Sequence, residues 1–467
     1  MQSAVGDCHL AAVDREAVAR WLRAWRRATD VVGSQWAFIS ALYRAFCEEE
    51  TGIGIRDAQT MNRTKDWSVR YGQLMTAAAL LSLAWSAVAA PEAERQKVAS
   101  ANVGFAFKLL KEVVKGEPGR NVFISPYGAA SVLQMACTGA GRQTKREMEG
   151  VLGTVGLPTE VVNGANRDFD RMLNGKGTNI ILSVANAIWC QKDAGVKSDF
   201  VASCQECFGA TVDEVDFSDP RSVGIINAWA SEKTHGRISS IADGIINSLT
   251  ELFLADAVYF KGRWDEPFDV KMTKNRVFHL RGGKQKQVPM MEQTRKFDYR
   301  RGSGYEAVRL EYQGWSLGMY VFLPDAGSRP EKLVSIMTGD TWQRVTEPGF
   351  SRREGTVVLP KFKMEYGVEL KGPLMALGMR TAFGKADFTG IADHGLFVSA
   401  VRQRTFIEVN EEGTEAAAVT GMNIEMGIDM NPPKPFRMIV DRPFLFMIEE
   451  KETKAILFMG VVFDPGV

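Results

Sequence analysis

The sequence predicts an α+β fold, and two observations support this class. Apolar residues recur at helical spacing in three segments before residue 153. From about residue 180 onward, runs rich in β-branched and aromatic residues are typical of strands, with two further helical segments between them. Helices first and many long strands later favour large sheets that are mostly antiparallel or mixed.

The expected elements follow one another in one large domain. Helices are expected over residues 103–114, 129–137, 145–152, 221–234 and 370–377. Strands are expected over residues 180–189, 252–260, 307–310, 319–322, 356–362, 405–409, 444–448 and 456–462. After residue 90 the chain has no long Pro-, Gly- or Ser-rich linker and no internal repeat that would divide it.

The composition excludes some classes of protein. The 467 residues are 45% hydrophobic, which is ample for a large buried core. Because 57 basic side chains balance 56 acidic ones, the net charge of +1 provides no global attraction for nucleic acid or for an anionic membrane. Six cysteines do not make a disulfide scaffold in a chain of this length.

Cys204 and Cys207 form a CxxC pair, which suggests a redox or metal half-site. The chain has only four histidines and no second CxxC to complete a zinc site. We therefore interpret the pair as two small apolar side chains one helical turn apart. No metal or other cofactor is expected.

Residues 61–89 have the order of a secretory signal peptide. A basic leader comes first, then an apolar stretch over residues 74–83, then the small-x-small pattern of a cleavage site at residues 87–89. The apolar stretch is too short for a comfortable membrane span, and a buried core helix is the alternative interpretation. We expect a secreted protein that starts near Ala90. Residues 1–60 are then an extension of unknown role upstream of Met61.

Residues 314–318 match the GxSxG pattern of the hydrolase nucleophile elbow. That elbow requires a strand, a strained turn and then a helix. Here residues 305–312 and 319–324 both resemble strands, so the sequence predicts a hairpin with glycines in its turn. Only His394 lies downstream to serve as a base. We expect no enzyme active site.

Several short segments, in the same order along the chain, resemble the serpin family of serine protease inhibitors. They are residues 121–126 (NVFISP), 255–264 (ADAVYFKGRW), 322–325 (FLPD), 359–362 (LPKF), 441–446 (DRPFLF), 458–460 (FMG) and 464–465 (DP). The match extends from about residue 98 to residue 467. The resemblance implies a serpin domain over residues 90–467, with three β-sheets, a large central sheet, eight or nine helices and an exposed reactive-centre loop at about residues 411–436.

Residues 411–421 (EEGTEAAAVTG) are very close to the hinge of inhibitory serpins. Gly413 provides a pivot with wide backbone freedom. The small side chains that follow can enter a sheet with little steric resistance, and period-2 alternation turns Glu415 outward. We expect the hinge to comprise Gly413, Thr414, Glu415, Ala416, Ala417 and Ala418.

The resemblance implies a single-use mechanism. A serine protease attacks the exposed loop and forms an acyl-enzyme, and the cut loop then inserts into the central sheet and drags the protease along. The exposed segment from Thr414 to Gly427 is about 14 residues, roughly 45 Å as a strand. A non-inhibitory serpin with a carrier, storage or chaperone role is the alternative, although such members usually carry bulky, charged or proline residues in the hinge.

The regions that must open for insertion, called shutter and breach in the family, are expected at Ser125, Asp256, Trp264 and Gln403. Asp256 and Gln403 replace the asparagine and histidine that are usual there. An Asp carboxylate can accept a hydrogen bond from the Gln amide, so the pair can replace the usual one. Gly128 replaces a second serine. These three departures from the family pattern all lie where the sheet must open.

Family spacing from Gly413 places the reactive bond between Gly427 and Ile428, with Met426 and Met430 as alternative bait residues. No Arg or Lys occurs between residues 413 and 431. The expected targets are therefore elastase-, chymotrypsin- or subtilisin-like proteases rather than trypsin-like ones. We expect a monomer without stable membrane association. Heparin is not an expected partner, because residues 156–177 contain no cluster of basic residues.

Overall fold

The computed structural model of the chain describes residues 92–174, 180–314, 316–347, 349–414 and 434–466. The N-terminal extension, the expected signal peptide and the expected reactive bond at residues 426–430 lie outside these residues. So do the hinge residues Glu415, Ala416, Ala417 and Ala418.

Six strands form the central sheet. In spatial order they are β10 (Phe362–Glu369), β11 (Val398–Asn410), β12 (Gly413–Thr414), β4 (Leu252–Arg263), β2 (Ile180–Gln191) and β3 (Thr211–Val215). Strand β4 pairs antiparallel with β2 and parallel with β11, so the sheet is mixed. The first nine residues of β4 are all buried, which is typical of a strand covered on both faces.

The second sheet has nine strands. Its spatial order is β1 (Val122–Ile124), β15 (Ile456–Val462), β14 (Phe444–Glu450), β8 (Leu317–Pro324), β7 (Tyr305–Glu311), β6 (Gln285–Gly302), β9 (Ser351–Pro360) and β13 (Phe436–Ile439), and β5 (Lys274–His279) also pairs with β6. Strand β6 pairs with β5 and β9 along most of its length and with β7 at its end. Hydrogen bonding therefore gives two sheets where three were expected, because β6 runs unbroken from one strand group into the other.

Nine α-helices lie within the described residues. They are α4 (Glu92–Gly116), α5 (Pro126–Thr138), α6 (Arg142–Leu152), α7 (Thr159–Asn174), α8 (Ser198–Phe208), α9 (Arg221–Lys233), α10 (Pro330–Ile336), α11 (Gly339–Thr346) and α12 (Lys371–Leu377). Short 3₁₀ helices are η2 (Val270–Met272), η3 (Arg281–Gly283) and η4 (Thr381–Phe383). The α+β class and the large central sheet are thus confirmed.

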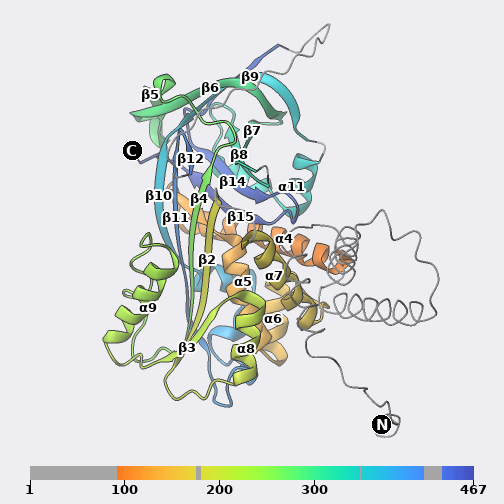
Figure 1. Cartoon of the computed structure of the whole chain (residues 1–467), viewed down its shortest axis with the longest axis vertical. Helices are drawn as coiled ribbons and strands as arrows, with labels where there is room; N and C mark the ends of the chain where they lie inside the picture. Colours follow the sequence, from red (N-terminus) through yellow and green to blue (C-terminus); the bar gives the residue numbers. More distant parts are fainter. Residues whose placement is uncertain (1–91, 175–179, 315, 348, 415–433, 467) are drawn as a thin grey trace, which may run out of the picture. The chain divides into compact units, whose positions relative to one another are not determined.

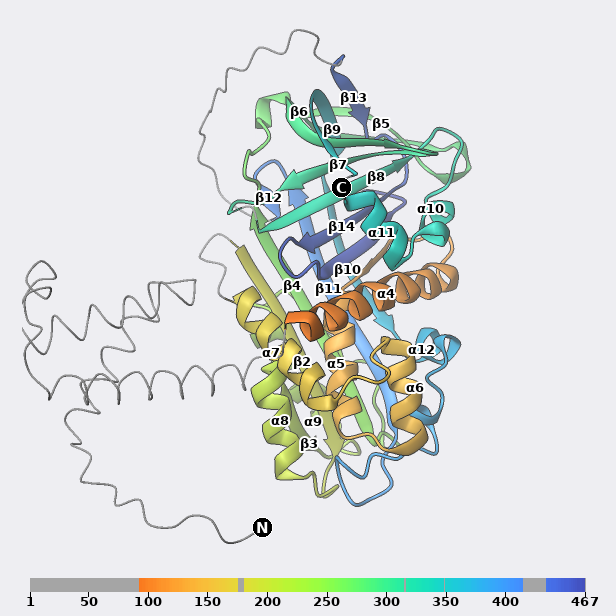
Figure 2. The ribbon, with the colours of Figure 1, turned by 90° about the vertical axis from the view of Figure 1, so that its right-hand side faces the viewer.

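The two faces of the central sheet are covered by different helices (Figures 1 and 2). Helix α9 packs its apolar side chains, including Trp229, on the face that carries Phe253. Helix α5 packs on the opposite face, on which Leu252 and Leu254 lie. Helix α5 begins at Pro126 because the Ser125 hydroxyl caps it by accepting a hydrogen bond from the backbone of Gly128. This cap fixes Ser125 beside the sheet.

Two further expectations from the sequence are confirmed. Strands β7 and β8 form an antiparallel hairpin, so a strand and not a helix follows the GxSxG segment. Cys204 and Cys207 are both buried in the core as free thiols, and burial raises the pKa of Cys204 to about 12. No group of metal-ligating side chains occurs among the residues that the structure describes.

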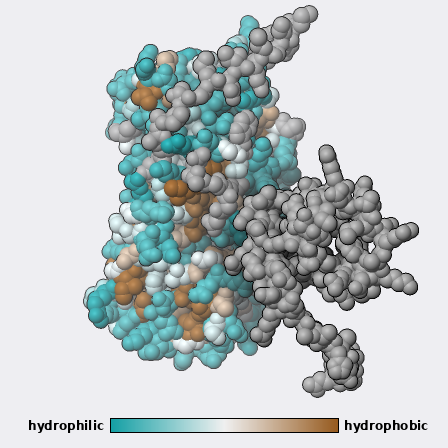
Figure 3. Space-filling model, viewed as in Figure 1, coloured by the Kyte–Doolittle hydropathy of each residue, from teal (hydrophilic) through white to brown (hydrophobic). Residues whose placement is uncertain are grey.

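Two observations concern apolar surface in the described part of the chain. None of the helices in the described part of the chain is long and apolar enough to cross a bilayer. On the face that Figure 3 shows, hydrophobic residues form small, separate areas among hydrophilic ones. Scattered areas of this kind are ordinary on protein surfaces.

Candidate functional site

The hinge enters the central sheet between β4 and β11. Thr414 pairs with Val409 of β11 on one side and with Gly262 of β4 on the other. Its side chain is completely buried, and its hydroxyl lies 3.0 Å from the hydroxyl of Tyr312. Thr414, expected at the start of the exposed loop, is therefore already inside the sheet.

Gly413 occupies a position that only glycine fits. Its φ angle is +144°, which side chains rarely adopt. A Cβ atom there would overlap the backbone carbonyl oxygen of Gly262. The glycine thus lets the chain turn back from the end of β11 into the gap between β11 and β4, which is called the slot below.

Trp264 holds the turn that connects β11 to β12. Its indole NH donates to the carbonyl of Asn410 at 3.0 Å, and its backbone NH donates to the carbonyl of Glu412 at 2.9 Å. The indole ring stacks on Tyr312 with a centroid separation of 4.6 Å. One aromatic pair therefore contacts both ends of the turn between β11 and β12, because Tyr312 also contacts Thr414.

Glu411 connects the same turn to Lys361, which lies between β9 and β10, and to Thr273, which follows η2. Its carboxylate accepts from Lys361 Nζ at 2.8 Å and from Thr273 Oγ1 at 2.8 Å. Although burial raises the pKa of Glu411, the hydrogen bonds from Lys361 and Thr273 outweigh it and lower the pKa below its usual value. The carboxylate is therefore charged at neutral pH.

A second cluster lies where β4 and β11 are still paired, below the hinge. Gln403 of β11 uses both ends of its amide on Ser125, since Nε2 donates to the Ser125 carbonyl at 2.7 Å and Oε1 accepts from the Ser125 NH at 2.9 Å. Its Nε2 also donates to Asp256 Oδ2 at 2.5 Å, which is the bond expected from the sequence. The Ser125 hydroxyl donates to the carbonyl of Leu457 at 2.7 Å. Helix α5, β4, β11 and β15 therefore meet in one hydrogen-bonded cluster.

Asp256 is fully buried in this cluster, opposite Gly128. A Cβ atom on Gly128 would lie 2.5 Å from both carboxylate oxygens of Asp256, so the missing side chain makes room for the carboxyl group. Burial raises the pKa of Asp256 to about 8, against the lowering effect of the Gln403 hydrogen bond.

The structure thus brings the expected residues together in two places. One place is the gap between β4 and β11 that β12 fills, where Gly413, Thr414 and Trp264 meet. The other lies further along the same two strands, where they are still paired and where Ser125, Asp256 and Gln403 meet.

Sequence reasoning missed Tyr312 and the partners of Glu411. Tyr312 ends an expected strand but lies 102 residues from Thr414 in the sequence. Lys361 belongs to the LPKF segment at residues 359–362, for which the sequence predicted no side-chain contact. No feature of the sequence pairs these residues.

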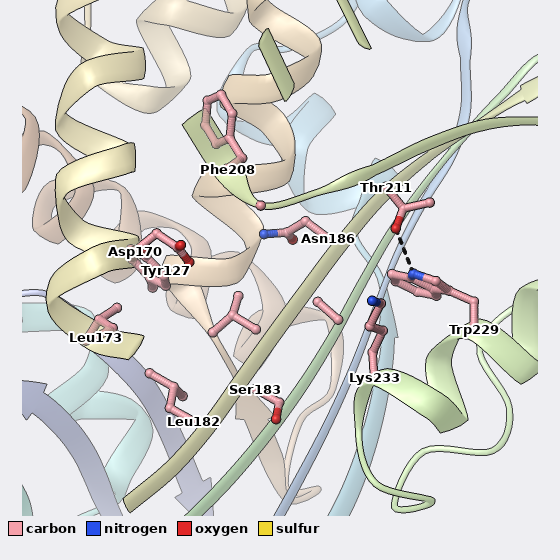
Figure 4. A pocket seen from close by; sticks show the side chains of 13 residues that line it. Tyr127, Asp170, Leu173, Leu182, Ser183, Asn186, Phe208, Thr211, Trp229 and Lys233 are labelled. Carbon is pink, nitrogen blue, oxygen red and sulfur yellow. Dashed lines mark hydrogen bonds between the residues drawn. The ribbon is translucent and has the colours of Figure 1, made fainter. Parts of the chain in front are cut away.

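A hollow of about 250 Å³ opens beside β2 (Figure 4). It lies where β3 no longer accompanies β2, since β3 pairs only with residues 187–191. Figure 4 shows Tyr127 and Asp170 on one side of it, and Trp229, bonded to Thr211 at 3.1 Å, on the other. Asn186 of β2 also lines the hollow. The hollow therefore borders β2, whose residue Asn186 pairs with Asp256 of β4.

Comparisons with known proteins identify the family. A family model described as Serpin (serine protease inhibitor) matches residues 100–465. Leukocyte elastase inhibitor of Bos taurus is 35% identical over 388 residues, covering 79% of this chain and 100% of that protein. The crystal structure of Serpin48 from Tenebrio molitor matches with a TM-score of 0.70 and 32% identity, covering 79% of this chain and 98% of Serpin48.

Human thyroxine-binding globulin, in complex with thyroxine, has the same fold at 25% identity, with a TM-score of 0.73 and coverage of 80% of this chain and 100% of that protein. The chain belongs to the serpin family. Its relatives include protease inhibitors, and its structural neighbours include a thyroxine-binding globulin.

Proposed function

We propose that the chain is a secreted, single-use inhibitor of serine proteases that works by inserting its cut loop between β4 and β11. The observation that carries the proposal is the position of β12. Thr414 already occupies the end of the slot, while β4 and β11 remain paired over residues 252–259 and 398–406. The residues that follow Thr414 would insert where β4 and β11 are now paired, as these two strands separate.

The chemistry belongs to the protease. Its serine hydroxyl attacks the carbonyl carbon of the bait residue, an ester forms, and the peptide bond breaks to release a new amino terminus. Water would then hydrolyse the ester. The released loop instead enters the slot, carries the esterified protease with it and distorts the protease before hydrolysis occurs. This chain contributes the bait and the slot and is not an enzyme.

The proposed targets are elastase-, chymotrypsin- and subtilisin-like proteases. The proposed bond is Gly427–Ile428, with Met426 and Met430 as alternative bait residues. The name of the relative from Bos taurus, leukocyte elastase inhibitor, is in line with an elastase-like target. We propose that the protein acts as a monomer without heparin.

The test is incubation of residues 90–467 with elastase, chymotrypsin, subtilisin and trypsin. We expect an SDS-resistant complex with at least one of the first three proteases, and mass spectrometry of the released fragment identifies the bond. Cleavage of the loop without a covalent complex, across the whole panel, would contradict inhibition and favour the non-inhibitory alternative.

Secretion has a separate test. N-terminal sequencing of the protein from cells that express the whole chain should find a mature terminus near Ala90 on protein in the medium. Protein that remains inside the cells with residues 1–60 intact would contradict export.

A further inference from the structure

Two buried oxygen atoms in the middle of the central sheet have no hydrogen-bond partner. They are Oδ1 of Asp256 on β4 and Oδ1 of Asn186 on β2. The two residues are directly opposite one another in the antiparallel β2–β4 pair, so their side chains lie on the same face. The Cβ atoms of such a pair are about 4.5–5.5 Å apart, which brings the two side-chain ends within reach of each other.

Gln403 does not satisfy either atom. Its two amide hydrogens are already used, one on the carbonyl of Ser125 and one on Asp256 Oδ2. Its carbonyl oxygen accepts from the NH of Ser125. Gln403 therefore leaves Asp256 with a single hydrogen bond from a neutral donor.

No charged side chain of the described residues compensates Asp256. On β11, Arg402 and Arg404 flank Gln403 and by alternation lie on the opposite face of the sheet. On α5 the nearest ionisable residue is Tyr127, whose pKa is raised by burial and by Asp170 of α7. Only burial and the Gln403 hydrogen bond act on the pKa of Asp256. A carboxylate in this position would be a buried charge without a counterion.

We propose that Asp256 is a protonated carboxylic acid in the closed sheet, and that its proton bridges Asp256 Oδ1 to Asn186 Oδ1. One proton then satisfies both orphan oxygens and removes the buried charge. Loss of the proton leaves two acceptors facing each other beside the line along which β4 and β11 must part. Asp256 thus makes opening of the sheet sensitive to pH. This consequence for the loop rests on the function proposed above, whereas the protonation itself does not.

The sign of the pH effect follows from linkage. Burial raises the pKa of Asp256 to about 8 in the folded state, so the folded chain holds a proton that the unfolded chain releases. Stability from this group is greatest at acidic pH and falls as pH rises toward about 8. Within this window the ratio of folded to unfolded protein falls by up to about tenfold for each pH unit. Above about pH 8 the effect levels off.

Three variants test the proposal by chemical unfolding between about pH 6 and about pH 9. Asp256→Asn mimics the neutral acid, since its amide can donate to Asn186 and accept from Gln403, and should lack the alkaline loss of stability. Thr405→Val is the matched control, because it removes only the bond from Thr405 Oγ1 to the Phe123 carbonyl, 2.7 Å long, in the same cluster. It should lower stability equally at every pH. Asn186→Ala should shift the loss to lower pH, because the acid loses its acceptor.

Infrared spectroscopy gives a second readout that does not involve protease. Near neutral pH, the difference spectrum between the natural chain and Asp256→Asn should contain the carbonyl stretching band of a protonated carboxyl group, and taking the difference removes any contribution from Glu311 and Glu449, whose pKa values burial also raises. Parallel stability curves for the natural chain and Asp256→Asn, or no such band, would overturn the protonation. An Asn186→Ala curve that does not shift would overturn the bridge to Asn186.

The two proposals fail separately. If the pH effect and the infrared band are present but no protease is trapped at any pH, the protonated acid stands and the inhibitory function is wrong. If protease is trapped and Asp256→Asn has the same pH profile as the natural chain, the function stands and the protonated acid is wrong.

Discussion

Glu411 connects the hinge to Lys361 in the link between β9 and β10, and this pair is more buried than most ion pairs among the residues that the structure describes. The Glu411 side chain is 7% exposed and that of Lys361 is 32% exposed. We expect Glu411→Gln to lower the free energy of unfolding by about 1–3 kcal/mol, because it removes the charge from a buried hydrogen-bonded pair. Urea unfolding at neutral pH measures the change.

The control for this variant is an ion pair between β10 and β11. Lys363 and Glu408 form a more exposed pair at 3.3 Å, so Glu408→Gln should change the free energy by less than about 1 kcal/mol. The difference between the two variants should also shrink in acid. The lowered pKa of Glu411 means that its stabilisation is present above the usual carboxyl range and is lost as pH falls through the folded pKa. Equal effects of both variants at neutral pH would contradict a special role for Glu411.

Gly128 gives a second prediction at the residue scale. We expect Gly128→Ala to destabilise the chain by about 1–3 kcal/mol, because its Cβ would lie 2.5 Å from the Asp256 carboxylate in a closely packed core. Gly150 in α6 is the control: it is exposed, and a Cβ there meets nothing within 4 Å. Gly150→Ala should be neutral or stabilising by up to about 1 kcal/mol. Thermal unfolding of both variants measures the change in stability. An equal loss of stability in both would contradict the overlap with Asp256 as the cause.

The residue scale also shows where prediction from sequence stopped. Asp256 and Gln403 stood out as departures from the family pattern, and their hydrogen bond followed from side-chain chemistry. The accommodation of Asp256 by Gly128 did not follow, because 128 residues of chain separate the two and only packing brings them together. The buried partners of Glu411 were hidden for the same reason.

At the scale of elements, the buried strands were the easiest to predict. The expected strand at residues 252–260 is β4 without its last three residues, since a strand covered on both faces is a continuous apolar run. Strand β6 was missed, because exposed and half-buried polar side chains alternate along it and hide the apolar face. Strand β12 could not be predicted at all. Its two residues form a strand only because β4 and β11 separate to admit them.

The turn into β12 provides a prediction at this scale. We expect Gly413→Ala to displace β12 from the slot, because the φ of +144° is strained for alanine and its Cβ would overlap the Gly262 carbonyl. The free energy of unfolding should fall by roughly 1–3 kcal/mol. Hydrogen exchange should accelerate in peptides that cover Gly262 and Val409, the strand partners of Thr414.

Gly395 is the control for this variant, because it lies in a loop before β11 with open space around it. Gly395→Ala should leave exchange near Gly262 unchanged. Unchanged exchange in Gly413→Ala as well would mean that the glycine is not needed to hold β12 in place.

At the scale of the whole molecule, we expect that cutting the loop stabilises the protein. If the cut loop inserts as proposed, the chain gains a long strand in the middle of its central sheet, with hydrogen bonds to both β4 and β11. We expect limited proteolysis within residues 415–433 to raise the thermal midpoint markedly, as followed by circular dichroism. A cut chain that melts at the same temperature as the intact one would contradict insertion.

Thr414→Arg tests the central claim, insertion between β4 and β11, most directly. Arginine in the buried position of Thr414 would place an unpaired charge in the slot, at a cost of roughly several kcal/mol. Thr414→Ser is the matched control, since it keeps a small side chain and the hydroxyl that lies beside Tyr312. The measurement is the fraction of cleaved inhibitor that retains protease in an SDS-resistant complex, using whichever protease the natural chain traps. Thr414→Ser should trap protease like the natural chain, whereas Thr414→Arg should be cut and released without trapping it. Equal trapping by Thr414→Arg and the natural chain would contradict insertion through this hinge.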